Sequence, residues 1–103
     1  MGLARSRSLT VTADGANNQT VGVSAKKGAV VTISGTITGA VTLQRRGADN
    51  TWRDVTTNAG VVTTFTAVGT YTITPQEVQA EYRLNAKSGA VSAFPFTMMI
   101  EGR

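Results

Sequence analysis

The chain has 103 residues, which suits one domain, and its 10 Lys and Arg against 6 Asp and Glu give a formal net charge of +4. It contains no cysteine and no histidine, which excludes disulfides, thiolate metal sites and Ser-His-Asp or Cys-His catalytic centres. Hydrophobic residues make up 41% of the chain and aromatic residues 6%, so the core must consist mainly of Val, Ile, Leu and Ala. No segment approaches the roughly 18 apolar residues of a transmembrane helix, and we expect no membrane partner.

Residues 1–7 contain Arg5 and Arg7 but no alternating apolar pattern. We expect them to form a flexible N-terminal arm, followed by one domain over residues 8–103. Within that domain, apolar and polar residues alternate with the period of a half-buried strand. The segments that show this pattern are 8–13, 20–25, 29–37, 41–46, 51–55, 61–67, 70–74, 81–86 and 90–100. Their spacing predicts an all-β fold, a single antiparallel β-sandwich of about eight strands.

The stretch from Val41 to Val55 is the most informative hairpin. Val41 and Leu43 share one face of the first strand, and a polar turn over residues 47–50 leads to Trp52. Trp52 is the only Trp of the chain and its largest apolar side chain, so we expect it in the core. Trp52 and Val55 have opposite parity, which predicts a bulge between them. The larger side chains expected in the core are Leu43, Trp52, Phe65, Tyr71, Tyr82 and Leu84.

Two predicted strands contain an interrupting residue. Gly35 lies within segment 29–37 and predicts either a bulge or the close approach of another backbone. Pro95 lies within segment 90–100, and because proline has no N–H to donate, we expect this strand to lie at a sheet edge or to bulge there. Met99 has the opposite parity to the apolar residues of that segment and is expected to be an exposed contact residue.

Segment 75–80 is the only candidate helix. Thr74 can cap it, and Pro75 suits the first helical position. It is long enough for one short helical turn or two at most, so the predicted class stays all-β.

The acidic residues give little support to metal or catalytic chemistry. A calcium site would use Asp49, Asn50 and Asp54, but the sequence lacks the Gly and Glu that complete an EF-hand loop. Gly35 and Gly39 are not followed by the helix that a phosphate-binding loop needs. We therefore expect no enzyme activity, no metal and no cofactor.

A nucleic-acid interface would need basic residues interleaved with aromatic ones. Arg45, Arg46, Trp52 and Arg53 come nearest to this pattern. Adjacent residues of a strand point to opposite faces, so Arg45 and Arg46 cannot belong to one patch. Nucleic acid is therefore not an expected partner.

Several segments resemble small β-sandwich proteins of tailed bacteriophage particles. In those proteins Leu-Gln-Arg-Ser leads through a polar turn into Thr-Trp-x-Asp-Val, and residues 41–46 and 51–55 follow this pattern with Arg46 in place of the Ser. The segments that resemble the continuation of the family pattern are 69–73, 81–86 and 88–91. The resemblance extends over residues 41–91, and its layout is similar to immunoglobulin-like and fibronectin-type-III sandwiches.

The resemblance implies a structural virion protein, namely a head decoration (cement) protein that binds the outer surface of a phage head and stabilises it. Its partners would be the major capsid protein or other virion proteins, and it would be made in the host cytoplasm. A homo-oligomer, such as a trimer, is compatible with this role. The alternative is a carbohydrate- or receptor-binding sandwich of a fibre or tail accessory. The candidate capsid contacts are Arg5, Arg7, Arg45, Arg46, Arg53 and Met99.

Overall fold

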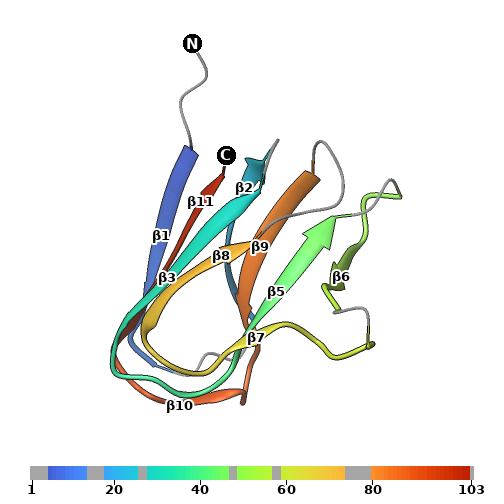
Figure 1. Ribbon diagram of the computed structural model, residues 1–103. Coiled ribbons are helices and arrows are strands. Elements are labelled where there is room, and N and C mark those ends of the chain that lie inside the picture. The colour runs from blue at the N-terminus through green and yellow to red at the C-terminus, as the bar shows by residue number, and fades with distance from the viewer. Residues whose placement is uncertain are drawn as a thin grey trace.

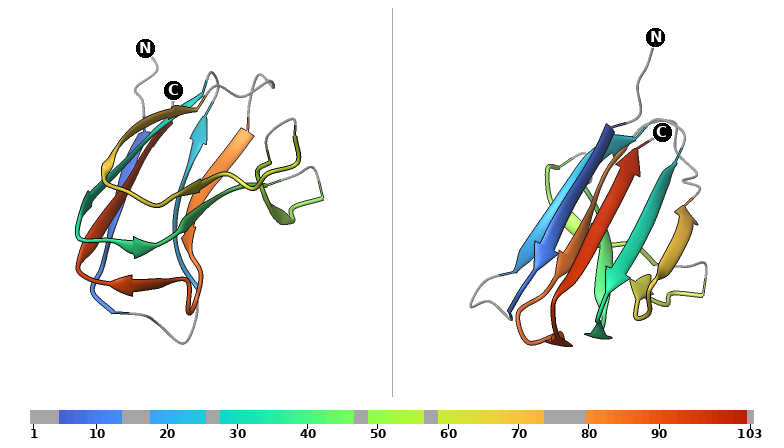
Figure 2. Two further views of the ribbon diagram at one scale, coloured as in Figure 1. Left: turned by 60° about the horizontal axis from the view of Figure 1, so that its bottom comes forward. Right: turned by 90° about the vertical axis from the view of Figure 1, so that its left-hand side faces the viewer.

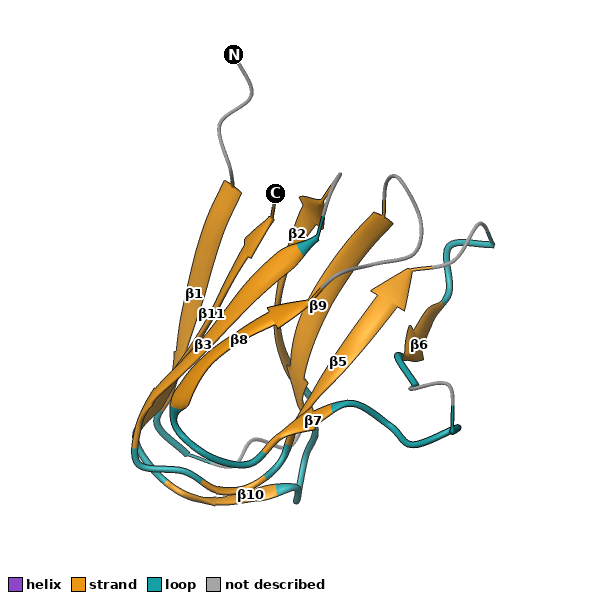
Figure 3. Cartoon of the chain, in the orientation of Figure 1, coloured by secondary structure: helices purple, strands orange, loops and turns teal. Residues whose placement is uncertain are grey.

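The computed structural model describes residues 5–13, 18–25, 28–46, 49–56, 59–73 and 80–102. The regular secondary structure of these residues is all β-strand (Figure 3), and every strand pair is antiparallel. The all-β, antiparallel prediction is therefore confirmed. None of these residues belongs to a helix that could span a membrane. The candidate helix over 75–80 lies outside the described residues, except for Ala80, which begins a strand.

The described residues form more strands than the eight or nine predicted, because several of them are only two or three residues long. The strands are β1 (Arg5–Val11), β2 (Gln19–Ala25), β3 (Ala29–Gly35), β4 (Thr38–Gly39), β5 (Val41–Arg46), β6 (Trp52–Asp54), β7 (Thr64–Phe65), β8 (Gly69–Ile73), β9 (Ala80–Ala86), β10 (Val91–Ala93) and β11 (Phe96–Gly102).

Two sheets lie face to face (Figures 1 and 2). Sheet I has the strand order β1-β11-β3-β8, and sheet II has the order β2-β9-β5-β6, with β7 pairing to one end of β5. The right-hand view of Figure 2 shows β1, β11 and β3 of sheet I side by side. β10 pairs with β4 and crosses between the two layers.

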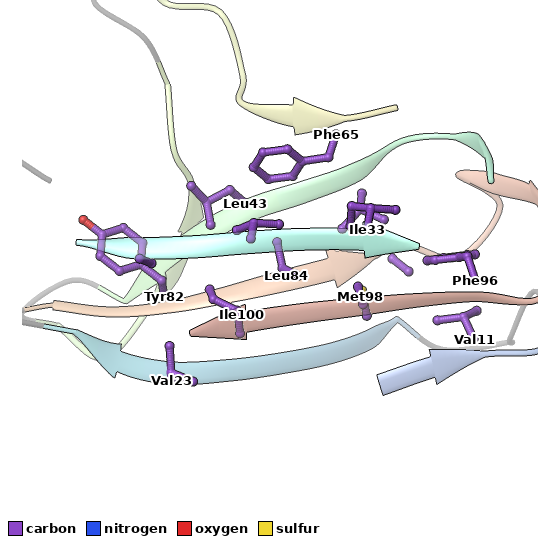
Figure 4. Close-up of a cluster of buried hydrophobic side chains, with 14 of the residues drawn as sticks. Val11, Val23, Ile33, Leu43, Phe65, Tyr82, Leu84, Phe96, Met98 and Ile100 are labelled. Atoms are coloured by element: carbon purple, nitrogen blue, oxygen red, sulfur yellow. The ribbon is translucent and has the colours of Figure 1, made fainter. Parts of the chain in front are cut away.

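The core lies between the two sheets (Figure 4). β11 illustrates how it forms, because Phe96, Met98 and Ile100 point inward and are buried, while the residues between them point outward. Leu43 and Leu84, both fully buried, approach from sheet II. The alternation of the sequence therefore builds one apolar layer from both sheets.

Most of the side chains expected in the core are found there. The buried ones are Leu43, Phe65, Tyr82 and Leu84. Tyr71 is half-buried and packs against the core, with its ring centroid 4.8 Å from that of Phe65. Trp52 is the exception.

The N-terminal arm is shorter than predicted. Arg5–Arg7 belong to β1, where they pair with β11 from Gly102 back to Ile100. These polar residues belong to sheet I because they pair with the last strand of the chain. Hydrophobic alternation within a segment cannot predict such a long-range pairing. Residues 1–4 lie outside the described residues.

Segment 90–100, predicted as one strand, is two strands in different sheets. β10 ends at Ala93 and β11 begins at Phe96, with Pro95 between them. β11 is not an edge strand, because it lies between β1 and β3. Proline, which cannot donate to a ladder, therefore lies in the crossing between sheets, where its carbonyl accepts a hydrogen bond from the Thr36 N–H at 2.9 Å.

Gly35 is a site of close backbone approach. It ends β3 with φ +94°, and a Cβ at this position would lie 2.7 Å from the carbonyl oxygen of Pro95. Of the two predicted alternatives, close approach is the one observed.

Candidate functional site

Trp52 lies on the outer face of sheet II and not in the core, so the sequence prediction for it is wrong. It stands opposite Arg46 in the β5–β6 pair and is half-buried. Val55 turns inward, packs against the core and donates its N–H to the Leu43 carbonyl at 2.9 Å. Ordinary alternation thus places Trp52 outside and Val55 inside, and the predicted bulge is not required.

Two guanidinium groups lie over the indole of Trp52. The Cζ atom of Arg83, from β9, is 4.5 Å from the ring centroid, and that of Arg46, from β5, is 5.7 Å away. Cation–π contacts of this kind stabilise by about 0.5–2 kcal/mol. Arg46 also forms an ion pair with Glu81, its partner in the β5–β9 register. These contacts hold a half-exposed Trp outside the core.

Gln44 organises the polar cluster next to Trp52. Its side chain is on the outer face of β5 and is buried. The Oε1 atom of Gln44 accepts hydrogen bonds from Arg83 Nε at 2.7 Å and from Asn85 Nδ2 at 3.1 Å. Its Nε2 atom donates to Asp54 Oδ1 at 2.8 Å. Gln44 therefore fixes the guanidinium of Arg83 against the indole.

Asp54 links this cluster to Lys87. The Lys87 Nζ atom lies 3.2 and 3.1 Å from the two carboxylate oxygens of Asp54. The hydrogen bond from Gln44 and then that from Lys87 hold the pKa of Asp54 below its ordinary value, although burial acts in the opposite direction. Burial also lowers the pKa of Arg83, but a guanidinium with an ordinary pKa above about 12 stays charged.

Asn85 is the least satisfied member of the cluster. Its side chain is 1% exposed, and its Oδ1 atom has no hydrogen-bond partner within the described part of the chain.

A shallow hollow of about 250 Å³ opens beside Trp52. We call it the Trp52 hollow, and its lining residues are Arg7, Gly22, Val23, Ser24, Trp52 and Glu81. Gly22 stands opposite Arg83 in the β2–β9 ladder, and a Cβ at Gly22 would lie 2.9 Å from the Tyr82 carbonyl oxygen and 3.0 Å from Arg83 Cβ. The missing side chain at Gly22 therefore keeps the hollow open.

Asp49 and Asp54 do not share a site. Asp49 accepts two hydrogen bonds from Arg53, at 3.0 and 2.7 Å, and one from the Thr51 N–H at 3.2 Å. The Arg53 hydrogen bonds hold the pKa of Asp49 well below its usual range, whereas Asp54 joins the Gln44 cluster. Within the described residues no three His, Cys, Asp or Glu side chains gather in a way that could hold a metal ion.

The predicted capsid contacts do not form one patch. Met99 is 38% exposed on the outer face of sheet I, whereas Arg46 belongs to the outer face of sheet II. Arg53 has the opposite parity to Trp52, and Arg7 is exposed and lines the Trp52 hollow from β1. The side chain of Arg5 is outside the described part of the structure.

Arg45 and Arg46 point to opposite faces, as the alternation predicts. Arg45 shares the parity of the buried Leu43 and lies near Tyr82, whose pKa is raised by burial and partly lowered by Arg45. Arg46 lies beside Trp52 and is paired with Glu81. This division separates the basic residues that a nucleic-acid interface would combine.

The outer face of sheet I has a different chemistry from that of sheet II. Its outward-facing side chains are Ser6, Ser8, Thr10, Val30, Thr32, Ser34, Thr70, Thr72, Thr97, Met99 and Glu101. Hydroxyl groups predominate, and Glu101 is the one charged member of this set. Hydroxyls of adjacent strands meet at 2.9 Å between Thr10 and Thr97.

Sequence reasoning missed Gln44, Arg83 and Asn85. The polar parity of Arg83 and Asn85 within segment 81–86 was a usable signal. What the sequence did not show is that β9 lies beside β5, which brings these side chains to Gln44.

The arrangement on sheet II is suited to binding. Asp54 and Glu81 are each paired with a cation, and the guanidinium of Arg83 packs against the indole of Trp52. Comparison with protein-family models, with curated proteins and with solved structures finds no match to this chain.

Proposed function

We propose that this chain is a non-catalytic structural protein of a tailed-phage particle, a head decoration protein with an immunoglobulin-like β-sandwich fold. The similarity of residues 41–91 to small phage sandwich proteins supports the virion role. The observation that carries the proposal is the outer face of sheet I, which is nearly free of charge although the chain has a net charge of +4. A shell-binding protein needs such a matched surface on a rigid scaffold rather than a reactive group.

Two features support the immunoglobulin-like sandwich. Two antiparallel sheets pack over one core. In addition, the Tyr71 hydroxyl donates a hydrogen bond to the Ala67 carbonyl at 2.8 Å. A Tyr bonded to the backbone a few residues upstream is the tyrosine corner of immunoglobulin-like sandwiches.

The docking surface in this proposal is centred on Met99. Ser8 of β1 and Thr32 of β3 flank Met99 in the sheet register. The cores of protein interfaces are depleted in charged residues and enriched in Met. We therefore propose that this face binds a capsid subunit whose own contact surface is apolar and bears hydroxyl groups. An acidic partner surface would be expected only if the chain docked through its basic residues, and the described residues of the outer face of sheet I include none.

Co-sedimentation with capsids of the encoding phage tests the role. A decoration protein should bind expanded, mature capsids saturably, at a fixed ratio to capsid subunits, and should not bind precursor shells. The absence of binding to either shell would contradict the decoration role. The homo-oligomer stays a prediction, and sedimentation velocity of the purified protein measures it.

Two lysine variants test the docking face. Met99→Lys places a charge in the centre of the face and should abolish capsid binding, because the desolvated charge would have no partner. Thr20→Lys, at an exposed position of β2 in sheet II, should bind as the unmodified chain does. Normal binding by Met99→Lys, or an equal loss in both variants, would contradict the docking face.

One observation favours a second candidate function, carbohydrate or receptor binding by a fibre or tail accessory. Such proteins present an aromatic platform at their surface, and the half-buried Trp52 is placed on the outer face of sheet II. The two functions use opposite faces, so one protein could have both.

A further inference from the structure

We propose that the Trp52 hollow binds one sugar ring of an acidic oligosaccharide, with the ring packed against the indole and its carboxylate directed toward Arg7. This site does not depend on capsid docking, because it uses the outer face of sheet II. It can therefore be tested on the purified chain, and its failure would leave the decoration role untouched.

The walls of the hollow match the two chemical sides of a sugar. A pyranose ring has an apolar C–H face and a rim of hydroxyl groups, so its site needs an aromatic surface together with hydrogen-bonding groups. The indole of Trp52 supplies the first, and the Ser24 hydroxyl and the Glu81 carboxylate supply the second. The three side chains project from different strands, β6, β2 and β9, into one space.

The aromatic platform is fixed before any ligand arrives. Arg83 packs 4.5 Å from the indole centroid and is bonded to Gln44, which is itself bonded to Asp54 of the strand that carries Trp52. A side chain that is already ordered loses less conformational entropy on binding. The Gln44 cluster therefore has a positioning role, which accounts for a polar network on a face that apolar residues could have covered.

The size of the hollow suits a single ring. Its volume of about 250 Å³ is below the roughly 300–1,000 Å³ of sites for complete small molecules. Because the hollow is shallow and Gly22 leaves it open over β2, the rest of an oligosaccharide can continue across sheet II. The ligand is therefore one unit of a longer glycan.

Charge selects an acidic sugar. Arg46, Arg53 and Lys87 are each paired with a carboxylate. Within the described residues, Arg7 has no such ion pair, and it lines the hollow. A guanidinium recognises a carboxylate through two parallel hydrogen bonds. The prior pairing of Arg46, Arg53 and Lys87 also disfavours nucleic acid, which needs several cations available for phosphates.

Fluorescence titration tests the site, because Trp52 is the only Trp and lies within it. The ligands are an oligogalacturonate and a neutral cello-oligosaccharide of the same length, with oligothymidylate as the nucleic-acid probe. We expect a saturable change in emission with the oligogalacturonate alone. Equal binding of the neutral sugar, stronger and steeply salt-dependent binding of oligothymidylate, or no binding at millimolar ligand would overturn the proposal.

Variants separate the acidic-sugar site from general attraction. Arg7→Gln should raise the Kd for oligogalacturonate by about tenfold or more, because it removes a charge-assisted contact. Arg53→Gln removes an equal charge outside the hollow and should leave the Kd unchanged. Trp52→Ala, followed by calorimetry, should abolish binding. A Kd that is the same in Arg7→Gln as in the unmodified chain, or that rises equally in both Arg variants, would overturn the assignment.

Discussion

The Cζ atom of Arg83 lies 4.5 Å from the centroid of the Trp52 ring. This contact partly covers the only Trp of the chain, which is half-buried on the outer face of sheet II and is not in the core. Arg83 comes from β9, inside sheet II, whereas Trp52 comes from the edge strand β6. The contact therefore ties a three-residue edge strand, which has little ladder of its own, to the centre of its sheet.

Replacement of Trp52 should destabilise the fold less than replacement of a core residue. We expect Trp52→Ala to lower the free energy of unfolding by about 1–2 kcal/mol, through loss of cation–π contact and partly buried area. Leu84→Ala, at a fully buried position, should lower it by about 2–5 kcal/mol. Urea unfolding followed by circular dichroism measures both values. A loss for Trp52→Ala as large as that for Leu84→Ala would show that Trp52 is a core residue.

Gln44 should be important for stability although it is polar and on the outer face. Gln44→Leu leaves the Nε of Arg83 and the Nδ2 of Asn85 without their acceptor. We expect a loss of about 2–3 kcal/mol in the free energy of unfolding. It should be accompanied by a shift of Trp52 emission, since Arg83 is no longer held against the ring.

Thr42→Val is the matched control for Gln44→Leu. Thr42 is also buried on the outer face of β5, but it is not part of the Gln44 cluster. Its replacement removes a single hydroxyl and none of the cluster's hydrogen bonds, so it should change the free energy of unfolding by only about 1 kcal/mol or less and leave the emission unchanged. Similar losses in the two variants would indicate that burial, and not the hydrogen bonds, makes Gln44 important.

The stabilising contribution of Asp54 should be lost in acid. Its pKa is lowered in the folded protein by Gln44 and Lys87, whereas an unfolded Asp titrates near about 3.9. The stabilisation is therefore complete above that value and is lost as the pH falls through the lower folded pKa. Asp54→Asn should lose less stability between pH 7 and acid than the unmodified chain does, as measured by urea unfolding across pH.

Lys87→Met gives the control for this pH effect. Gln44 is the larger cause of the lowered pKa, so this variant should keep most of the acid sensitivity that Asp54→Asn removes. The lowered pKa of Asp49 is common to all three proteins and does not affect the comparison. Identical pH profiles for Asp54→Asn and the unmodified chain would contradict the prediction.

Strand parity predicted which residues share a face, but not which face is inward. Leu43 and Leu84 were predicted correctly because several apolar neighbours share their parity. Trp52 was assigned to the core on its size alone, although Val55, of opposite parity, could fill the same role. Trp52 lies on the outer face because it stands opposite Arg46 and packs against Arg83. Both contacts depend on which strands pair.

Long-range pairing was the other feature that the sequence did not reveal. Arg5–Arg7 were assigned to a flexible arm, because nothing in their composition shows that β1 pairs with β11. Pro95 was recognised as an interruption, but its position between strands of different sheets follows from the crossing of β10. Some residues of the candidate site could therefore be singled out from the sequence. Which of them lie together depends on the strand order, which the sequence did not reveal.

Gly39 should tolerate substitution less well than another glycine with positive φ. At Gly39 φ is +111°, and a Cβ would collide with the carbonyl oxygen of Ala90, where β4 meets β10. At Gly60 φ is +82°, and a Cβ would meet no atom within 4 Å. Gly60→Ala should thus lower the free energy of unfolding by only about 1–2 kcal/mol, the cost of holding Ala in the left-handed backbone conformation.

Gly39→Ala must in addition separate β4 from β10, because the added Cβ would meet the Ala90 carbonyl group, a backbone group that cannot move aside by a change of rotamer. We expect it to lose clearly more stability than Gly60→Ala and to increase hydrogen exchange at the Ala40 N–H, which bonds the Ala90 carbonyl at 3.2 Å. Urea unfolding and amide exchange of both variants measure this. Equal losses, with Ala40 exchange unchanged, would mean that the β4–β10 contact does not constrain the crossing between the sheets.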